Sequence, residues 1–162
     1  MIRSFNTALE RLYYIAGGAF FLVFVGCVMF QILARNLLSG SFVWTDEIAM
    51  FCFIWSVFLG TAVGFRRGAH YVVEILPIHF VRANLALTLL ALALCLPLIG
   101  LLAIDGLTYA QMSWRRFSFS LGYPMFYQNI AVAVSGAGMA IFSLELIAET
   151  YRRLASSASR GH

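Results

Sequence analysis

The sequence predicts an all-α integral membrane protein with four transmembrane helices, short interfacial helices in the connections, and both termini in the cytoplasm. Of the 162 residues, 62% are hydrophobic and only 11% are charged, against roughly 45–50% and about 25% in soluble domains. Four stretches almost free of charge are each long enough to cross a hydrocarbon core of about 30 Å as a helix. They lack the alternation of apolar and polar residues that a transmembrane β-barrel requires. We expect a single four-helix membrane domain over residues 1–162, because spans leave little room for a separate soluble domain.

The predicted spans cover residues 12–34, 48–65, 83–104 and 126–147. Arg3 and Arg11 precede the first span, a pattern that also introduces secretory signals. This span is too long for a signal, and no small-residue cleavage site precedes the next polar loop. We therefore expect it to be retained.

The arginines predict the orientation, because the chain contains no lysine. Four spans place the two termini and the second connection on one side, together with eight of the eleven arginines. The other side carries Arg35, Arg115 and Arg116. The positive-inside rule then places both termini in the cytoplasm. The isoelectric point near 9.3 is explained by this topology and by anionic lipid head groups, so we expect no nucleic-acid partner.

The second span begins with Trp44, Thr45, Asp46 and Glu47. Thr45 or Asp46 is predicted to cap the helix, the carboxylates suit the positive end of its dipole, and Trp44 suits the bilayer interface. Glu47 lies deeper than a cap requires, and Arg35 at the same end of the first span is its candidate partner. Two interpretations stay open for Glu47: a functional or subunit contact, because charges at membrane depth often mark function, and a plain capping turn.

Further along the second span, Gly60 and Gly64 form a G-x-x-x-G face. Such a face lets another helix approach closely, although the same spacing also arises by chance in glycine-rich spans. Arg66 complements the helix C-terminus, and Gly68 is the predicted stop.

The second connection places His70 and Glu74 one helical turn apart. Two ligands, with only His79 beyond Pro77 as a weak third, do not make a tetrahedral metal site. We interpret the segment as a polar anchor in a short interfacial helix that ends before Pro77. The three cysteines lack C-x-x-C spacing. We expect no catalytic, cofactor-binding or metal-ligating residue in this chain.

The third connection is long and rich in aromatic residues, and it contains Trp114, Arg115, Arg116 and Tyr123. One interpretation is an interfacial loop or helix among the lipid head groups. The other is a docking surface for a periplasmic partner, because exposed apolar residues rimmed by charge can mark interfaces.

An ordered set of these residues resembles a known family. The residues follow the pattern W-x-[DE]-E, then G, then R-x-x-x-H-x-x-x-[DE]. They are Trp44, Asp46, Glu47, Gly60, Arg66, His70 and Glu74. This pattern is similar to that of the DctQ-type small membrane subunit of tripartite ATP-independent periplasmic (TRAP) transporters. The likeness covers nearly the whole chain and is sharpest over residues 44–77. Glu74 stands where Asp is more usual.

The resemblance implies a role that composition does not show. In that family a periplasmic substrate-binding protein captures an organic acid, of the C4-dicarboxylate or sugar-acid class. A large membrane (M-type) subunit then carries the acid inward with sodium ions, so the substrate and sodium sites are expected in that partner. The small subunit is a scaffold in the bacterial inner membrane. The expected partners are thus the M-type subunit, the binding protein and membrane lipids.

The span centres agree with this role independently. A coupled transporter usually needs carboxylates or unwound helices near the midplane, whereas these centres offer mainly glycine, serine, threonine and cysteine as polar or small residues. Two alternatives are a stand-alone small four-helix exporter and a membrane anchor subunit of a respiratory enzyme. The exporter requires a glutamate in the first span, which has none. A haem-binding anchor requires histidine within the spans, and all three histidines lie outside them.

Overall fold

The computed structural model describes residues 2–37, 42–68 and 81–159. These residues form the helices α1 (Ile2–Leu37), α2 (Val43–Arg66), α3 (Val81–Met112) and α4 (Phe126–Ser159), and a short 3-10 turn, η1 (Ser113–Arg115). All four α-helices are long and apolar enough to cross a membrane, which confirms the predicted all-α class with four transmembrane helices. Each contains one predicted span. His70 and Glu74 lie outside the described residues, so the interfacial helix proposed for them stays a prediction.

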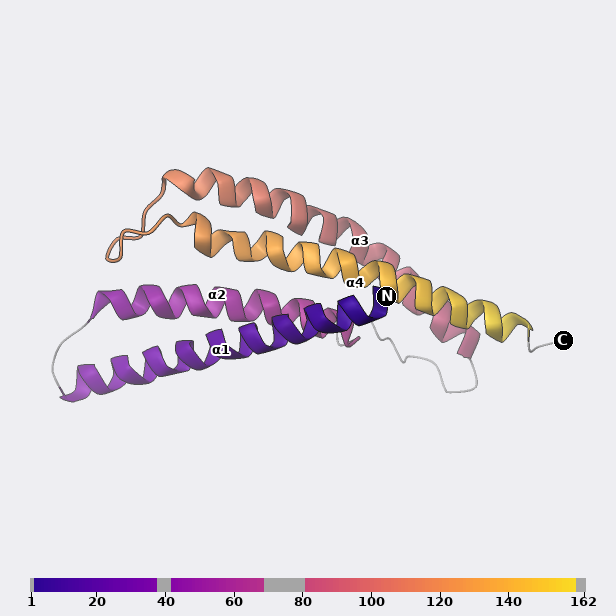
Figure 1. The fold of residues 1–162 in the computed structure, drawn as a ribbon, viewed down its shortest axis with the longest axis horizontal. Helices are drawn as coiled ribbons and strands as arrows, with labels where there is room; N and C mark the ends of the chain where they lie inside the picture. Colours follow the sequence, from indigo (N-terminus) through magenta and orange to yellow (C-terminus); the bar gives the residue numbers. More distant parts are fainter. Residues whose placement is uncertain (1, 38–41, 69–80, 160–162) are drawn as a thin grey trace.

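The helices form an open layer and not a closed bundle. α1 pairs with α2, α3 pairs with α4, and the two hairpins join where α2 packs on α4. Figure 1 shows the resulting order across the layer, α1, α2, α4 and α3. Within the described part of the chain, no Cα atom of α3 lies within 8 Å of a Cα atom of α1 or α2. α2 and α4 are therefore the inner helices, and α1 and α3 are the outer ones.

Burial follows this order. In the most apolar stretch of each helix, 39% of the residues of α2 and 44% of those of α4 are buried, against 6% for α1 and 11% for α3. The core contains six buried side chains from three helices: Ala62, Phe65, Leu92, Ile99, Met139 and Phe142. The outer helices thus direct most of their apolar side chains away from the chain, toward lipid or another membrane protein.

Glycines allow the closest helix approach inside the layer. A Cβ atom on Gly136 of α4 would lie 2.6 Å from the backbone nitrogen of Ala103 on α3, and one on Gly106 would lie 3.0 Å from the nitrogen of Ala133. Small residues at such crossings let two backbones approach within a membrane. A Cβ on Gly60 would meet nothing within 4 Å. The predicted G-x-x-x-G face is thus open at Gly60, and its use by a partner stays a prediction.

Polar side chains add hydrogen bonds between helices. Tyr13 of α1 donates to the carbonyl oxygen of Val134 at 2.9 Å. Ser135 of α4 donates to the carbonyl oxygen of Phe58 at 2.7 Å, and the Trp55 indole donates to that of Tyr127 at 3.0 Å. Because hydrocarbon offers no competing water, such bonds help to hold transmembrane helices together. α4 is linked in this way to both helices of the first hairpin.

The connection between α3 and α4 is a compact turn. α3 continues to Met112, so residues 105–112 are helical and only residues 116–125 form the loop. Phe117 and Pro124 pair as an isolated antiparallel bridge, and the Ser118 amide donates to the Tyr123 carbonyl oxygen at 2.9 Å. Gly122 closes the turn with φ +67°, a conformation that glycine adopts without steric cost.

Candidate functional site

Glu47 attaches the first turns of α2 to the connection between α3 and α4. Its carboxylate accepts hydrogen bonds from the Ser118 hydroxyl, from the Ser120 amide at 2.7 Å and from the Leu121 amide at 2.9 Å. Consecutive backbone N–H groups in a turn form an anion-binding concavity, and hydrogen bonds to a charged acceptor are stronger than neutral ones. We call this contact the Glu47 anchor.

The partner predicted for Glu47 is wrong. Arg35 forms no ion pair with Glu47, and its side chain instead lines a pocket with Asp46. The Glu47 carboxylate is occupied by donors from the α3–α4 connection, which lies 71 to 74 residues further along the chain. The long separation explains the error, because sequence spacing alone does not bring these donors to α2.

The capping prediction is also wrong. α2 begins at Val43, and its N-cap residue, Phe42, makes no side-chain capping bond. Thr45 is already inside the helix, and its hydroxyl donates a hydrogen bond to the Phe42 carbonyl oxygen at 2.6 Å. A capping side chain would instead accept a hydrogen bond from a backbone amide. Asp46 accepts a hydrogen bond from the Gln31 side chain of α1. The acidic pair therefore connects α2 to two other parts of the chain.

Tyr123 holds the connection that carries the Glu47 anchor against α2 and α4. Its ring packs edge-on against Phe51 of α2, with the ring centroids 5.9 Å apart, and its hydroxyl donates to the Gln128 side chain at 3.1 Å. Burial, followed by the nearby Glu47 charge, raises the pKa of Tyr123 above its usual value, so the phenol stays protonated and keeps this donor. Trp114, Arg115 and Arg116 are exposed, and their docking role stays a prediction.

Arg66 holds the other end of α2. Its guanidinium bonds to the Glu10 carboxylate, to the Asn6 carbonyl oxygen at 3.0 Å and to the Glu145 carboxylate at 3.3 Å. The group also lies over the Phe142 ring, 5.3 Å from its centroid. The exposed fraction is only 12% for the Arg66 side chain, 17% for Glu10 and 13% for Glu145. This cluster, the Arg66 anchor, joins α1, α2 and α4.

Two neighbours complete the Arg66 anchor. The Asn6 amide donates to Glu145 at 2.8 Å, and Arg67 bonds to Glu10 at 2.7 Å while its own side chain stays 57% exposed. Just beyond, Gly68 adopts φ +81° and its amide bonds to the Phe65 carbonyl oxygen at 3.1 Å. The predicted helix stop at Gly68 is therefore confirmed.

Glu10 and Glu145 were not predicted as site residues from the sequence. One signal was available for Glu145, which is the only charged residue inside the four predicted spans, because an ionisable residue within a span is a functional candidate by default. Glu10 carries no comparable signal, since it lies before the first predicted span among other polar residues. Its place opposite Arg66 depends on the pairing of α1 with α2.

The two anchors have related chemistry. In each, a charged side chain of α2 is neutralised or solvated by groups from distant segments, so that each end of the inner helix is fixed to the opposite hairpin. Among the residues that the structure describes, no three His, Cys, Asp or Glu side chains gather as metal ligands would. The groups described in the two anchors hold the helices in a fixed layer.

Comparison with known proteins identifies the family. The sequence model of the family described as tripartite ATP-independent periplasmic transporters, DctQ component, matches residues 24–153. A sialic acid TRAP transporter small permease protein, SiaQ, of Vibrio cholerae is 28% identical over 133 residues, which cover 80% of this chain and 77% of that protein.

A second relative is much longer than this chain. The sialic acid TRAP transporter permease protein SiaT of Haemophilus influenzae is 30% identical over 60 residues, which cover 37% of this chain and 10% of that protein. The family match extends over most of the chain. It includes the whole Glu47 anchor, and it includes the Arg66 anchor apart from Asn6 and Glu10 of α1. The chain therefore belongs to the DctQ family of TRAP transporter small permease subunits, and it is a multi-pass inner-membrane component of a transporter and not an enzyme.

Proposed function

We propose that this chain is the scaffold that supports a large M-type membrane subunit during sodium-driven, binding-protein-dependent uptake of an organic acid. The observation that supports the proposal most strongly is the open layer of helices with α2 fixed at both ends. A closed bundle would bury its apolar faces internally, whereas this layer directs the faces of α1 and α3 outward. Such faces suit packing against another membrane protein.

The substrate and the ions belong to the partner in this proposal. Within each anchor the charged groups are already bound: Glu47 by a hydroxyl and two backbone amides, and Arg66 by two carboxylates. They are therefore unsuited to binding a transported anion. The sodium and substrate sites are therefore assigned to the M-type subunit. The names of both relatives specify sialic acid, which favours a sugar acid over a C4-dicarboxylate as the substrate class.

We further propose that the Arg66 anchor faces the cytoplasm and the Glu47 anchor faces the periplasm, as the distribution of arginines predicts. Trp114, Arg115, Arg116 and the almost fully exposed Phe119 (95%) then face the periplasm, where a loaded binding protein arrives. Tyr123 serves that surface indirectly, by holding the connection against α2.

Cysteine labelling tests the orientation. In a background without Cys27, Cys52 and Cys95, Phe119→Cys should react with an impermeant thiol reagent in intact cells, and Ser4→Cys should react only after lysis. Phe119 is a suitable probe because its side chain is exposed and, unlike that of the neighbouring Ser118, is not part of the Glu47 anchor. The reverse pattern would place both anchors on the opposite sides from those proposed.

Co-purification tests the scaffold proposal itself. The tagged chain, coexpressed with an M-type subunit and extracted in mild detergent, should elute with that subunit as one complex in size-exclusion chromatography. An unrelated four-helix membrane protein carrying the same tag serves as the control. Elution of the two proteins separately, with both well folded, would contradict the proposal.

A further inference from the structure

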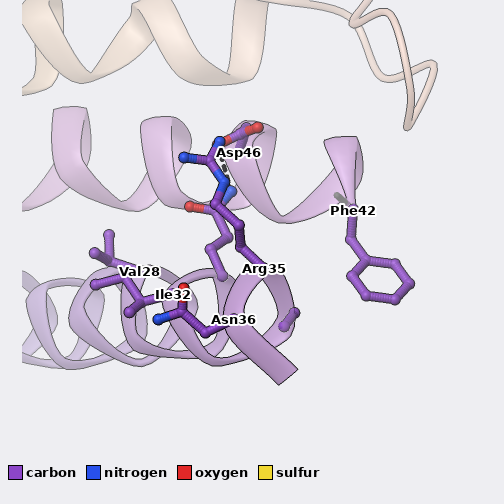
Figure 2. Close-up of a pocket in the computed structure, with 8 residues that line it drawn as sticks. Val28, Ile32, Arg35, Asn36, Phe42 and Asp46 are labelled. Atoms are coloured by element: carbon purple, nitrogen blue, oxygen red, sulfur yellow. Dashed lines mark hydrogen bonds between the residues drawn. The ribbon is translucent and has the colours of Figure 1, made fainter. Parts of the chain in front are cut away.

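A pocket lies at the Glu47 end of the α1–α2 hairpin. It has a volume of about 360 Å³ and is lined by Gln31, Ile32, Arg35 and Asn36 from α1 and by Phe42 and Asp46 on the α2 side. Figure 2 shows Arg35 extending from α1 toward Asp46 on α2. The pocket therefore combines a cation, an anion and apolar walls. Its size is near the lower end of the usual range for small-ligand pockets, about 300–1,000 Å³.

The charged groups of this pocket retain bonding capacity. The Arg35 guanidinium makes no hydrogen bond or ion pair with any residue that the structure describes, although it carries five N–H donors. On Asp46, Oδ1 accepts from the Gln31 amide, and Oδ2 has no donor among the described residues. Arginine presents a planar fork that matches phosphate oxygens in pairs. The pocket thus offers donors for a phosphate beside an acceptor for a cationic donor.

The depth of the pocket matches the head-group region of a bilayer. Arg35 lies in the last turn of α1, and Asp46 lies in the first turn of α2. Phe42, which lines the pocket, belongs to a cluster of three aromatic rings: the centroids of Phe30 and Phe42 are 5.8 Å apart, and those of Phe30 and Trp44 are 6.2 Å apart. Tryptophan is enriched where a bilayer meets water. A phospholipid is therefore the ligand present at this depth at high concentration.

We propose that this pocket binds the head group of phosphatidylethanolamine. The phosphate accepts hydrogen bonds from Arg35, and the primary ammonium group donates to Oδ2 of Asp46. Ile32 and Phe42 pack against the glycerol backbone. Phosphatidylcholine lacks an N–H donor for Asp46, and phosphatidylglycerol lacks the cation, so neither satisfies both charges. This site is separate from the scaffold proposal, because it depends only on the α1–α2 hairpin.

Native mass spectrometry of the purified full chain tests the site. The chain is incubated with equal amounts of short-chain phosphatidylethanolamine, phosphatidylcholine and phosphatidylglycerol. Phosphatidylethanolamine should be retained preferentially by the wild type. Arg35→Gln should weaken its retention by about tenfold or more, because a charge-assisted bidentate contact is lost. Arg116→Gln, which removes an exposed arginine from the α3–α4 connection, is the matched control and should bind as the wild type does.

Asp46→Asn tests the contact to the ammonium group separately from the contact to the phosphate. This variant should still bind phospholipid through Arg35, but it should lose the preference for phosphatidylethanolamine over phosphatidylcholine. Circular dichroism spectra equal to that of the wild type verify that each variant is folded. Equal retention by the wild type and Arg35→Gln, or equal retention of all three lipids by the wild type, would overturn the proposal. Unchanged retention by Arg35→Gln together with lost co-purification of the M-type subunit would assign the pocket to that partner instead.

Discussion

The two ends of α2 are fixed to the rest of the molecule by opposite means. At one end, the Glu47 carboxylate is held by a hydroxyl and by backbone amides of a single connection. At the other end, the Arg66 guanidinium is shared between carboxylates on α1 and α4. Losing Glu47 leaves donors in a turn that water can reach, whereas losing Arg66 removes the ion pair of the mostly buried Glu145 and leaves Glu10 only its pair with the exposed Arg67. The ends should therefore respond differently to mutation.

The largest expected effect is that of Arg66→Met. The substitution removes the ion pair of Glu145 and leaves Glu10 only its pair with Arg67, so the free energy of unfolding should fall by about 3 kcal/mol, at the lower end of the range for broken buried ion pairs. Denaturant unfolding of the full chain in detergent, followed by circular dichroism, measures this loss. Arg67→Met is the control, because its exposed pair with Glu10 should contribute no more than about 1 kcal/mol. Equal losses from both variants would remove the distinction between the Arg66 anchor and an ordinary surface ion pair.

A change at the crossing of α3 and α4 should have the next largest effect. Gly136→Ala places a Cβ atom against the backbone of Ala103, so α3 and α4 must separate, and we expect a loss of about 1–3 kcal/mol. The same unfolding experiment measures it. Gly60→Ala is the matched control: its Cβ meets open space, and alanine gains about 0.5–1 kcal/mol over glycine in a helix.

Gly60→Ala also tests the outer surface. If the M-type subunit packs on the G-x-x-x-G face, the variant should co-purify less of that subunit while its own stability is unchanged or improved. Unchanged co-purification would show that this face is not the contact. Gly136 of α4 thus tests a contact inside the layer, and Gly60 of α2 tests a contact on its surface.

The Glu47 anchor should show a smaller and local effect. Glu47→Ala should raise hydrogen exchange at the Ser120 and Leu121 amides by about tenfold or more, because both lose a charged acceptor. Mass spectrometry of peptides spanning residues 116–125 detects this change. Asp46→Ala is the control, since Asp46 bonds to α1 and not to the connection. Similar exchange in the two variants would contradict the Glu47 anchor and would leave Glu47 as a charge that interacts only with the helix end.

Much of the fold could be predicted from the sequence because hydropathy is a local property. Each of the four spans lies inside an observed helix, and Gly68 ends α2 by a conformation that its residue type permits. The open layer could not be predicted in this way. It depends on α2 packing against α4 and on close crossings such as that at Gly136, which involve pairs of helices and not the pattern of any one of them.

The candidate site was predicted in part. Glu47 and Arg66 were both selected from the sequence, and both are anchors, but the partner predicted for Glu47 was wrong and those of Arg66 were not identified. The donors to Glu47 lie in a turn whose shape depends on Gly122 and on the bridge between Phe117 and Pro124. Tertiary contacts over more than 50 residues bring Glu10 and Glu145 to Arg66. His70 and Glu74 remain predictions.

The central claim is that this chain supports a transporter and carries nothing alone, and reconstituted uptake tests it most directly. Liposomes containing only this chain, with an inward sodium gradient and labelled sialic acid, should take up no more than empty vesicles. Vesicles that also contain the M-type subunit and receive a loaded binding protein should take it up, and omitting this chain should strongly reduce that uptake. Sodium-dependent uptake by the isolated chain would contradict the claim, as would full activity of the M-type subunit without it.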